Sequence, residues 1–261
     1  MPYATEATLA ELDGLPRAVV AIATVYPPDH LLDWHRHRRA QLLYGARGTM
    51  LVEADGGAWT VPPNRAVTIP PGVAHRVRLL GVETNSLYLE PSAVPWWPSE
   101  CAVVEVSPLL RELLAAAVRM PPAYALAGRD GALAGLILHE LADLAPLPFH
   151  IGLPRDPALA GLCRAYLAAP DVSVSNRSWA RQLNRSERSL SRAFAEDCGM
   201  SPAAWRVRAR LLAALPLLRE GTVTEVSGAL GYASPAGFSA AFSRVFGQAP
   251  SAFTGAVDPR R

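Results

Sequence analysis

The sequence has 261 residues, half of them apolar, and a formal net charge of +2. This length allows two domains that each bury a core of their own. No stretch approaches the roughly 18 uncharged apolar residues that a membrane span needs, and the first residues lack the pattern of a signal peptide. The three cysteines form no CxxC pair, which argues against disulfides and zinc fingers. We therefore expect a cytoplasmic protein without a membrane partner.

Residues 16–89 alternate short apolar stretches with Pro-Pro, Gly-Gly and Pro-Gly turns. Strands of this length and spacing predict a small antiparallel sandwich or barrel. Beyond a connector rich in Pro and Trp, residues 107–119 and 129–144 are rich in leucine and predict two helices. Their apolar side chains could cover the barrel, but there are more of them than one side of a small domain needs. We therefore expect this segment to form a two-fold dimer interface.

Charge is divided unevenly along the chain. Residues 1–170 contain 13 Arg and 16 acidic residues, a net charge of −3, whereas residues 171–261 contain 12 Arg and 7 acidic residues, a net charge of +5. Lysine is absent, so every cationic side chain is the planar guanidinium of arginine. The basic C-terminal part suits a polyanionic partner.

The basic part contains one pattern twice. Leu190, Phe194, Gly199, Pro202 and Trp205 are followed, 48 residues later, by a second set with the same spacing: Phe238, Phe242, Gly247, Pro250 and Phe253. Two apolar residues at i and i+4 followed by glycine indicate a repeated helical unit. The surrounding pattern predicts helices at about 156–168, 175–183, 186–197, 202–219, 223–230 and 235–246, and a short one after Pro250.

The helix that starts near Ser186 has two distinct faces. Arg185, Arg188 and Arg192 share one face, while Leu190 and Phe194 point the opposite way. A preceding short helix and a tight turn complete a helix-turn-helix arrangement, whose second helix reads DNA. One such unit could equally be a bundle with a solvated arginine face, but two copies in a basic region favour DNA binding.

The match extends to a known family. Residues 156–257 resemble the AraC-type (AraC/XylS) DNA-binding domain, with WARQLNRSERSLSRAFAEDCGMSPAAW similar to its first helix-turn-helix and VTEVSGALGYASPAGFSAAFSRVFGQAPSAF similar to its second. The resemblance implies two recognition helices, in units at about 175–197 and 223–246, which enter successive major-groove segments of double-stranded DNA. The DNA-contacting residues that we expect are Arg181, Arg185, Ser186, Arg188, Ser189, Ser191, Arg192, Ser234, Ala236, Ser239, Ala240, Ser243 and Arg244.

The second recognition helix departs from the family pattern. Its outward residues are small, Ala240 stands where a long polar residue is common, and only Arg244 is long and charged. Such a surface can touch thymine methyl groups and phosphates but offers little bidentate base contact. We therefore expect Arg188 and Arg192 to dominate sequence readout, and the second unit mainly to position the protein.

Histidines in the N-terminal region suggest a ligand or metal site. His35 and His37 are expected on one face of a strand, with Gln41 on the same face if the strand runs unbroken. Together with His75 after Pro70-x-Gly72, they resemble the two metal motifs of the cupin barrel, although Gln41 replaces the usual Glu and Leu79 the usual Asn. No cofactor is certain. Three imidazoles and an amide oxygen could hold zinc or nickel, or they are hydrogen-bonded residues of a metal-free cavity. Aromatic side chains of an effector pocket are expected at Trp34, Tyr44 and Trp59.

The expected protein is a multi-domain α+β transcription regulator and not an enzyme. A cupin-like barrel (1–98) would sense a small molecule or metal, a helical segment (99–153) would dimerise, and an all-α double helix-turn-helix domain (154–261) would bind a promoter, contacting RNA polymerase if the protein activates. A metal-dependent cupin dioxygenase or isomerase with a helical appendage is the alternative, but it leaves the repeated helices unexplained. A DNA-binding architectural protein without a ligand is the third possibility.

Overall fold

A computed structural model describes residues 13–254, which divide into two compact units. The first unit contains residues 13–55 and Val61–Leu147, and the second contains Gly56–Thr60 and residues 148–254. Each unit has its own core, and the two are described separately. The second unit begins at residue 148, six residues before the boundary expected from the sequence, and the helical segment after residue 99 belongs to the first unit.

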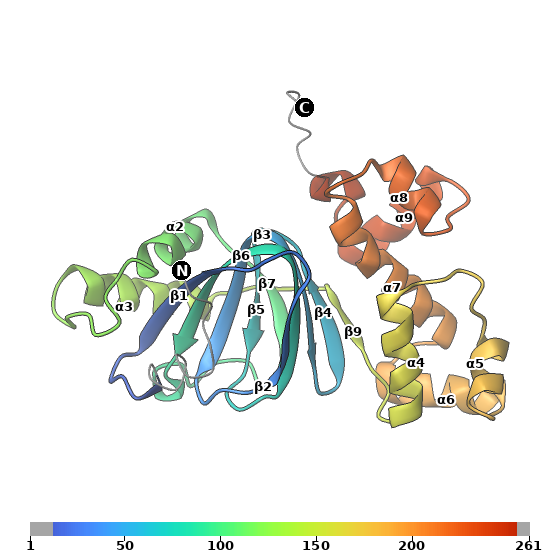
Figure 1. Cartoon of the computed structure of the whole chain (residues 1–261), viewed down its shortest axis with the longest axis horizontal. Coiled ribbons are helices and arrows are strands. Elements are labelled where there is room, and N and C mark those ends of the chain that lie inside the picture. The colour runs from blue at the N-terminus through green and yellow to red at the C-terminus, as the bar shows by residue number, and fades with distance from the viewer. Residues whose placement is uncertain (1–12, 255–261) are drawn as a thin grey trace. The chain divides into compact units, whose positions relative to one another are not determined.

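The first unit is built on a curled antiparallel sheet (Figure 1). Its strands follow the order β1-β6-β3-β5-β7-β8, and β2 also pairs with β6. The strands are β1 (Val19–Val25), β2 (His30–His35), β3 (Ala40–Ala54), β5 (Arg65–Ile69), β6 (His75–Leu89), β7 (Ala102–Glu105) and β8 (Pro146–Leu147). A short 3₁₀ turn, η1 (Pro91–Ala93), follows β6. The predicted small antiparallel fold is confirmed.

Two glycines allow the long strands β3 and β6 to bend together. These strands pair along their whole length, from Ala40 opposite Leu89 to Ala54 opposite His75, with register shifts around Arg47. Gly48 has a φ of 73°, and a Cβ atom on it would lie 2.3 Å from the carbonyl oxygen of Gly81. Only glycine fits this backbone crossing.

The bend brings the two ends of β6 close together. The ring of His37 lies 5.1 Å from the ring of His75 and 5.3 Å from that of Tyr88, between ring centres. A straight strand would separate His75 and Tyr88 by roughly 40 Å, because each residue advances the chain by about 3.3 Å. The curl therefore creates the site described below.

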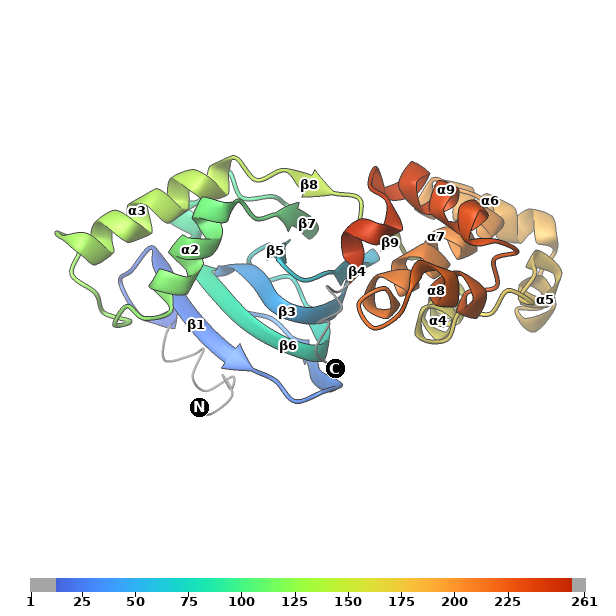
Figure 2. The ribbon, with the colours of Figure 1, turned by 90° about the horizontal axis from the view of Figure 1, so that it is seen from above.

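The two faces of this sheet differ in polarity. One face packs against helices α2 (Pro108–Ala117) and α3 (Arg129–Ala142), which lie side by side in Figure 2, through a buried cluster that includes Leu42, Tyr44 and Leu87. Gln41 and Tyr88 are paired across β3 and β6 and point to the other face, because neighbouring residues of a strand alternate. Burial of leucines by α2 and α3 confirms their covering role.

The second unit consists mainly of helices, each expected from the sequence: α4 (Pro157–Ala168), α5 (Asn176–Gln182), α6 (Glu187–Cys198), α7 (Pro202–Leu217), α8 (Val223–Ala229), α9 (Pro235–Phe246) and the 3₁₀ helix η2 (Pro250–Phe253). Ser or Thr side chains cap α5 to α9 by accepting a backbone N–H of the first turn. Gly199 and Gly247, equivalent in the repeat, end α6 and α9 in the left-handed conformation.

The proline-rich segment after α3 forms two short strands. They are β8 in the first unit and β9 (His150–Gly152) in the second. In the second unit, β9 pairs with residues 57–59 of β4 (Gly57–Val61), where Trp59 lies opposite His150. Prolines at the ends of this segment leave its middle residues free to pair, which the proline pattern alone does not reveal.

Candidate DNA interface and histidine site

The first helix-turn-helix is formed by α5 and α6. Trp179 of α5 stacks on Phe194 of α6 with ring centres 5.8 Å apart, and both side chains are buried together with Leu190. Asn184 has a φ of 52° and makes the tight turn between the helices. The apolar stripe predicted for α6 therefore holds the helix in place, and its opposite face is exposed.

The exposed face of α6 carries the residues expected to read DNA. Ser186, Arg188, Ser189 and Arg192 line a surface hollow. Within residues 13–254, Arg188 makes no salt bridge, and Arg192 has only a long one of 3.9 Å to the exposed Glu196. Exposed pairs of this kind contribute little to stability. Both guanidinium groups are thus available to base edges or phosphates.

Arg185 differs from these two arginines. Its Nη2 atom donates a hydrogen bond of 2.6 Å to Asp156 at the start of α4. This bond lowers the pKa of the Asp156 carboxyl, and so does the backbone N–H of Leu159 that the same carboxyl caps. Arg185 therefore fastens the turn to α4, and its predicted contact with DNA would require this bond to break. Arg181 and Ser191 lie at the surface nearby.

The second helix-turn-helix is formed by α8 and α9. Phe238, Phe242 and Phe246 of α9 are buried. The outward residues expected from the sequence are exposed or half-buried: Ser234, Ala236, Ser239, Ala240, Ser243 and Arg244. The Ser234 hydroxyl oxygen accepts the N–H of Gly237, which leaves its proton and one lone pair for a partner. The outward face of α9 thus presents small side chains and one long cation, Arg244.

Three arginines of α7 bond to other parts of this unit, and of these Arg206 is buried while Arg208 and Arg210 are half-buried. Arg206 donates to Asn176 (2.9 Å) and stacks over Trp179, and Arg210 donates to the hydroxyl of Tyr166 (2.9 Å). Arg208 donates to the backbone oxygens of His150 and Pro148. The net positive charge of the C-terminal region thus overstates the number of arginines that are available to contact DNA. Sequence reasoning missed these roles because the partners lie up to 60 residues away.

The three predicted histidines of the first unit do come together. The ring of His75 lies 4.3 Å from that of His35 and 5.1 Å from that of His37. The reason differs from the expected one, because β2 ends at His35 and His37 follows in a loop, so strand alternation does not align them. The bend of β6 and the pairing of His35 with His75 bring the rings together.

Each of these imidazoles is oriented by a backbone carbonyl. Nδ1 of His35 lies 2.7 Å from the backbone oxygen of Asp33, and Nδ1 of His37 lies 2.6 Å from that of Arg39. Nδ1 of His75 lies 2.9 Å from the backbone oxygen of Val73. Because a carbonyl can only accept, Nδ1 of His35 and of His75 carries the proton, and Nε2 of these two rings keeps its lone pair. His37 differs, because its Nε2 atom also faces an oxygen, Oε1 of Gln41. Burial lowers the pKa of His37, and it lowers the pKa of His75 to about 4, so both are neutral at pH 7.

Gln41 lies between His37 and Tyr88. Its Oε1 atom lies 3.0 Å from Nε2 of His37, its Nε2 atom donates to the Tyr88 hydroxyl (3.1 Å), and all three side chains are buried. The donor types around this point suit zinc or nickel. Within the described residues, however, no group of three or more His, Cys, Asp or Glu side chains is arranged to hold a metal ion. The contact with Gln41 occupies one nitrogen that a metal would need.

The predicted aromatic pocket is not formed by the three expected side chains. Trp34 is 46% exposed beneath Arg76, and Tyr44 lies in the apolar cluster under α2 and α3. Trp59 belongs to the second unit. Alternation along β2 and β3 turns Trp34 and Tyr44 away from the histidines. Tyr88, which the sequence did not single out, is the aromatic residue that faces them.

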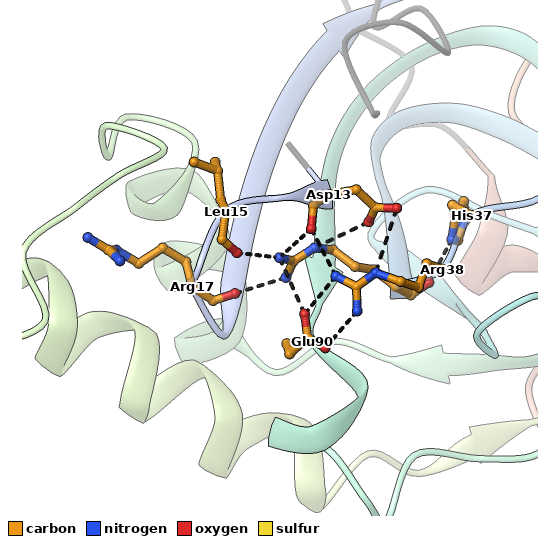
Figure 3. Close-up of polar contacts among 7 residues, drawn as sticks. Asp13, Leu15, Arg17, His37, Arg38 and Glu90 are labelled. Atoms are coloured by element: carbon orange, nitrogen blue, oxygen red, sulfur yellow. Dashed lines mark hydrogen bonds and ion pairs between the residues drawn. The ribbon is translucent and has the colours of Figure 1, made fainter. Parts of the chain in front are cut away.

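A buried arginine, Arg39, connects the histidine loop to the start of the described chain. Its partners Leu15, Arg17 and Glu90 are labelled in Figure 3, beside His37 and Arg38. Arg39 is 1% exposed and donates to the backbone oxygens of Arg17 (2.8 Å) and Leu15 (2.7 Å). Glu90 lies 3.4 Å from it and also pairs with Arg38. Arg39 thus fixes residues 15–17 against β3 next to His37.

Comparison with known proteins agrees with this arrangement. Residues 17–190 match the AraC-like ligand binding domain, and residues 179–256 match a helix-turn-helix domain. The HTH-type transcriptional regulator NimR of Escherichia coli (strain K12) is 30% identical over 221 residues, which are 84% of this chain and 81% of that protein. No helix in the described part of the chain is long and apolar enough to cross a membrane.

Solved structures show a looser likeness. ToxT from Vibrio cholerae, bound to (E)-4-(8-methylnaphthalen-1-yl)but-3-enoic acid, is 9% identical, with a TM-score of 0.39 over 91% of this chain and 98% of that one. An AraC-type DNA-binding regulator from Chromobacterium violaceum is 25% identical, with a TM-score of 0.34 over 36% of this chain and 86% of that one.

The cupin-like sheet and the paired helix-turn-helix units define a DNA-binding transcription regulator with a ligand-binding domain. The chain belongs to the AraC-type family of such regulators.

Proposed function

We propose that this regulator binds its promoter chiefly through the base contacts of α6, while α9 positions the protein on the next groove segment. The observation that carries the proposal is the contrast between the two exposed faces. Arg188 and Arg192 are unburied cations on α6, whereas α9 presents alanine and serine with a single Arg244. Arginine forms the bidentate contacts that distinguish guanine, while small residues touch methyl groups and the backbone.

Salt dependence of binding tests this proposal. If Arg181, Arg188, Arg192 and Arg244 approach phosphates or bases, the logarithm of the association constant should fall with the logarithm of salt concentration, with a slope of roughly −2 to −4. Fluorescence anisotropy with a duplex selected from a random library would measure the slope. Affinity that is absent for every duplex, or indifferent to salt, would refute the proposal.

We also propose that a small molecule binds on the polar face of the first unit, beside the histidines. Three features support this: the ligand-binding family match, the buried hydrogen-bonding groups of His37, Gln41 and Tyr88, and the neutral state of His75. Binding there would regulate the DNA-binding unit if the ligand favoured one of its conformations over another. No observation favours the alternative of a cupin enzyme, so we propose that the protein has no catalytic role.

A zinc or nickel ion at His35, His37, His75 and Gln41 is a second proposal for this site. The carbonyl-held Nδ1 atoms support it, because metal-bound histidines are commonly oriented in this way. The Gln41 amide would have to release His37. Elemental analysis of protein purified without a His-tag should find about one ion per chain, and fewer in His75→Asn. Metal-free protein whose melting temperature zinc and nickel leave unchanged would contradict the proposal.

Assembly and location follow from the same function. We propose a homodimer through α2 and α3, since Leu109 and Leu136 on these helices are large and exposed, at 48% and 43%. A dimer of this kind would bring four recognition helices to one promoter.

We also propose a cytoplasmic location, where the DNA is, and contact with RNA polymerase if the protein activates transcription.

A further inference from the structure

Residues 148–152 run across both helix-turn-helix units of the second unit, and we call them the strap. At one end, the backbone oxygen of Gly152 accepts hydrogen bonds from Nε1 of Trp205 (2.7 Å) and from Sγ of Cys198 (3.5 Å). Trp205 packs on Phe194 and Trp179, which form the core of the first helix-turn-helix. The strap is therefore fastened to the unit that carries α6.

The other end of the strap reaches the second helix-turn-helix. Phe149 is 1% exposed, and its ring lies 5.2 Å from that of Phe246 in α9 and 5.6 Å from that of Phe253 in η2. Phe253 also packs on Phe242 of α9. Aromatic clusters of this kind contribute beyond the area that they bury. Movement of α9 relative to the strap would break this cluster.

Arg208 holds the middle of the strap to the helix that joins the two units. Its Nε atom donates to the backbone oxygen of His150 (2.7 Å), and its Nη2 atom donates to that of Pro148 (2.8 Å). Hydrogen bonds from a charged donor are stronger than neutral ones. The strap is thus bonded to α6, α7 and α9 at separate points.

Other contacts also connect the two helix-turn-helix units. Arg210 of α7 bonds Tyr166 of α4 and lies over the ring of Tyr232, and Val172 packs against Gly231. α7 joins the two units along the chain, and the strap is a further connection between them. Two units that are joined by a single helix can rotate relative to each other at the turns that end the helix, whereas a second connection between the units restricts this rotation.

We propose that the strap sets the separation and relative angle of α6 and α9, and thereby selects operators by the spacing of their two groove segments. Phe149 and Arg208 are positioning residues in this role, because neither is on the face that meets DNA. The inference rests on the proposed function of α6 and α9. One extra base pair between the segments rotates the second by about 35° and moves it by about 3.4 Å. A rigid pair of helices cannot follow such a change.

The test compares spacing preferences of full-length variants. A duplex selected with wild-type protein is remade with one or two base pairs inserted between its two contacted segments, and anisotropy gives the affinity for each. The affinity of the wild-type protein should fall about tenfold or more for each inserted base pair, which is the range expected for a lost base contact. The affinity of Phe149→Leu and of Arg208→Ala should fall less than about threefold for each inserted base pair, with the base preferences at each segment unchanged.

Arg219→Ala is the matched control for charge. Arg219 follows the end of α7, and its side chain makes no hydrogen bond or ion pair within residues 13–254, so its removal should keep the wild-type spacing preference. Circular dichroism shows whether each variant is folded. Leucine is chosen at position 149 because it keeps an apolar side chain in the core and so favours folding. Phe149→Leu and Arg208→Ala proteins that bind DNA and keep the wild-type ratio would overturn the inference. Failure of the wild type to bind any duplex would instead overturn the proposed function.

Discussion

Replacing Arg188 by alanine should weaken binding to the selected duplex by about 1–3 kcal/mol and relax its sequence preference at one or two base pairs. Arg188 is exposed on α6, free of salt bridges within the described residues, and lies beside Arg192 in the same surface hollow. Its removal takes away a base contact without touching the buried side of the helix. Repeated selection from a random library, followed by anisotropy, measures both effects.

Arg244→Ala gives the contrast, because it removes the same charge from α9. If α9 mainly positions the protein, this variant should bind all sequences more weakly, with the salt slope reduced by about one and the preferred sequence unchanged. The two variants thus separate base readout from phosphate contact. An unaltered preferred sequence in Arg188→Ala, or a relaxed one in Arg244→Ala, would show that the roles of α6 and α9 have been assigned the wrong way round.

The helical unit could be predicted almost completely because its signals are local. A capping serine or threonine begins each of the helices α5 to α9, and Gly199 and Gly247 end the two recognition helices in the only conformation that closes their last turns without strain. The repeat then places these signals twice. Residues that act across long separations could not be assigned in this way. From the sequence, Arg208 cannot be told apart from an exposed cation, because its partner His150 lies far away along the chain.

The histidine site could be predicted only in part, for a related reason. The histidines were expected to meet through alternation along one strand, whereas β2 ends at His35 and the sheet bends elsewhere. A bulge of one residue changes the face to which every later side chain points. Trp34 and Tyr44 point away because alternation places them opposite His35 and Gln41 on their strands, and Tyr88 faces His37 instead. Glycines that cause such bends look like ordinary turn residues in a sequence.

Replacing Gly48 by alanine should therefore be among the most damaging single changes in the first unit. The new Cβ atom would lie 2.3 Å from the carbonyl oxygen of Gly81 and 2.6 Å from its carbon, and both belong to the backbone of β6. Neither strand can move without breaking the pairing that curls the sheet. We expect a loss of more than about 3 kcal/mol in the free energy of unfolding, from backbone strain and overlap together.

Gly72→Ala is the matched control for backbone strain alone. Gly72 has a φ of 74°, close to that of Gly48, but a Cβ atom on it would have no neighbour within 4 Å. Alanine there should cost about 1–2 kcal/mol. Urea unfolding followed by circular dichroism measures both variants. Because the curl brings His37 between His75 and Tyr88, Gly48→Ala should also disturb the histidine site, while DNA binding by the second unit should persist. Equal losses in the two variants would mean that the crossing at Gly81 does not hold the bend.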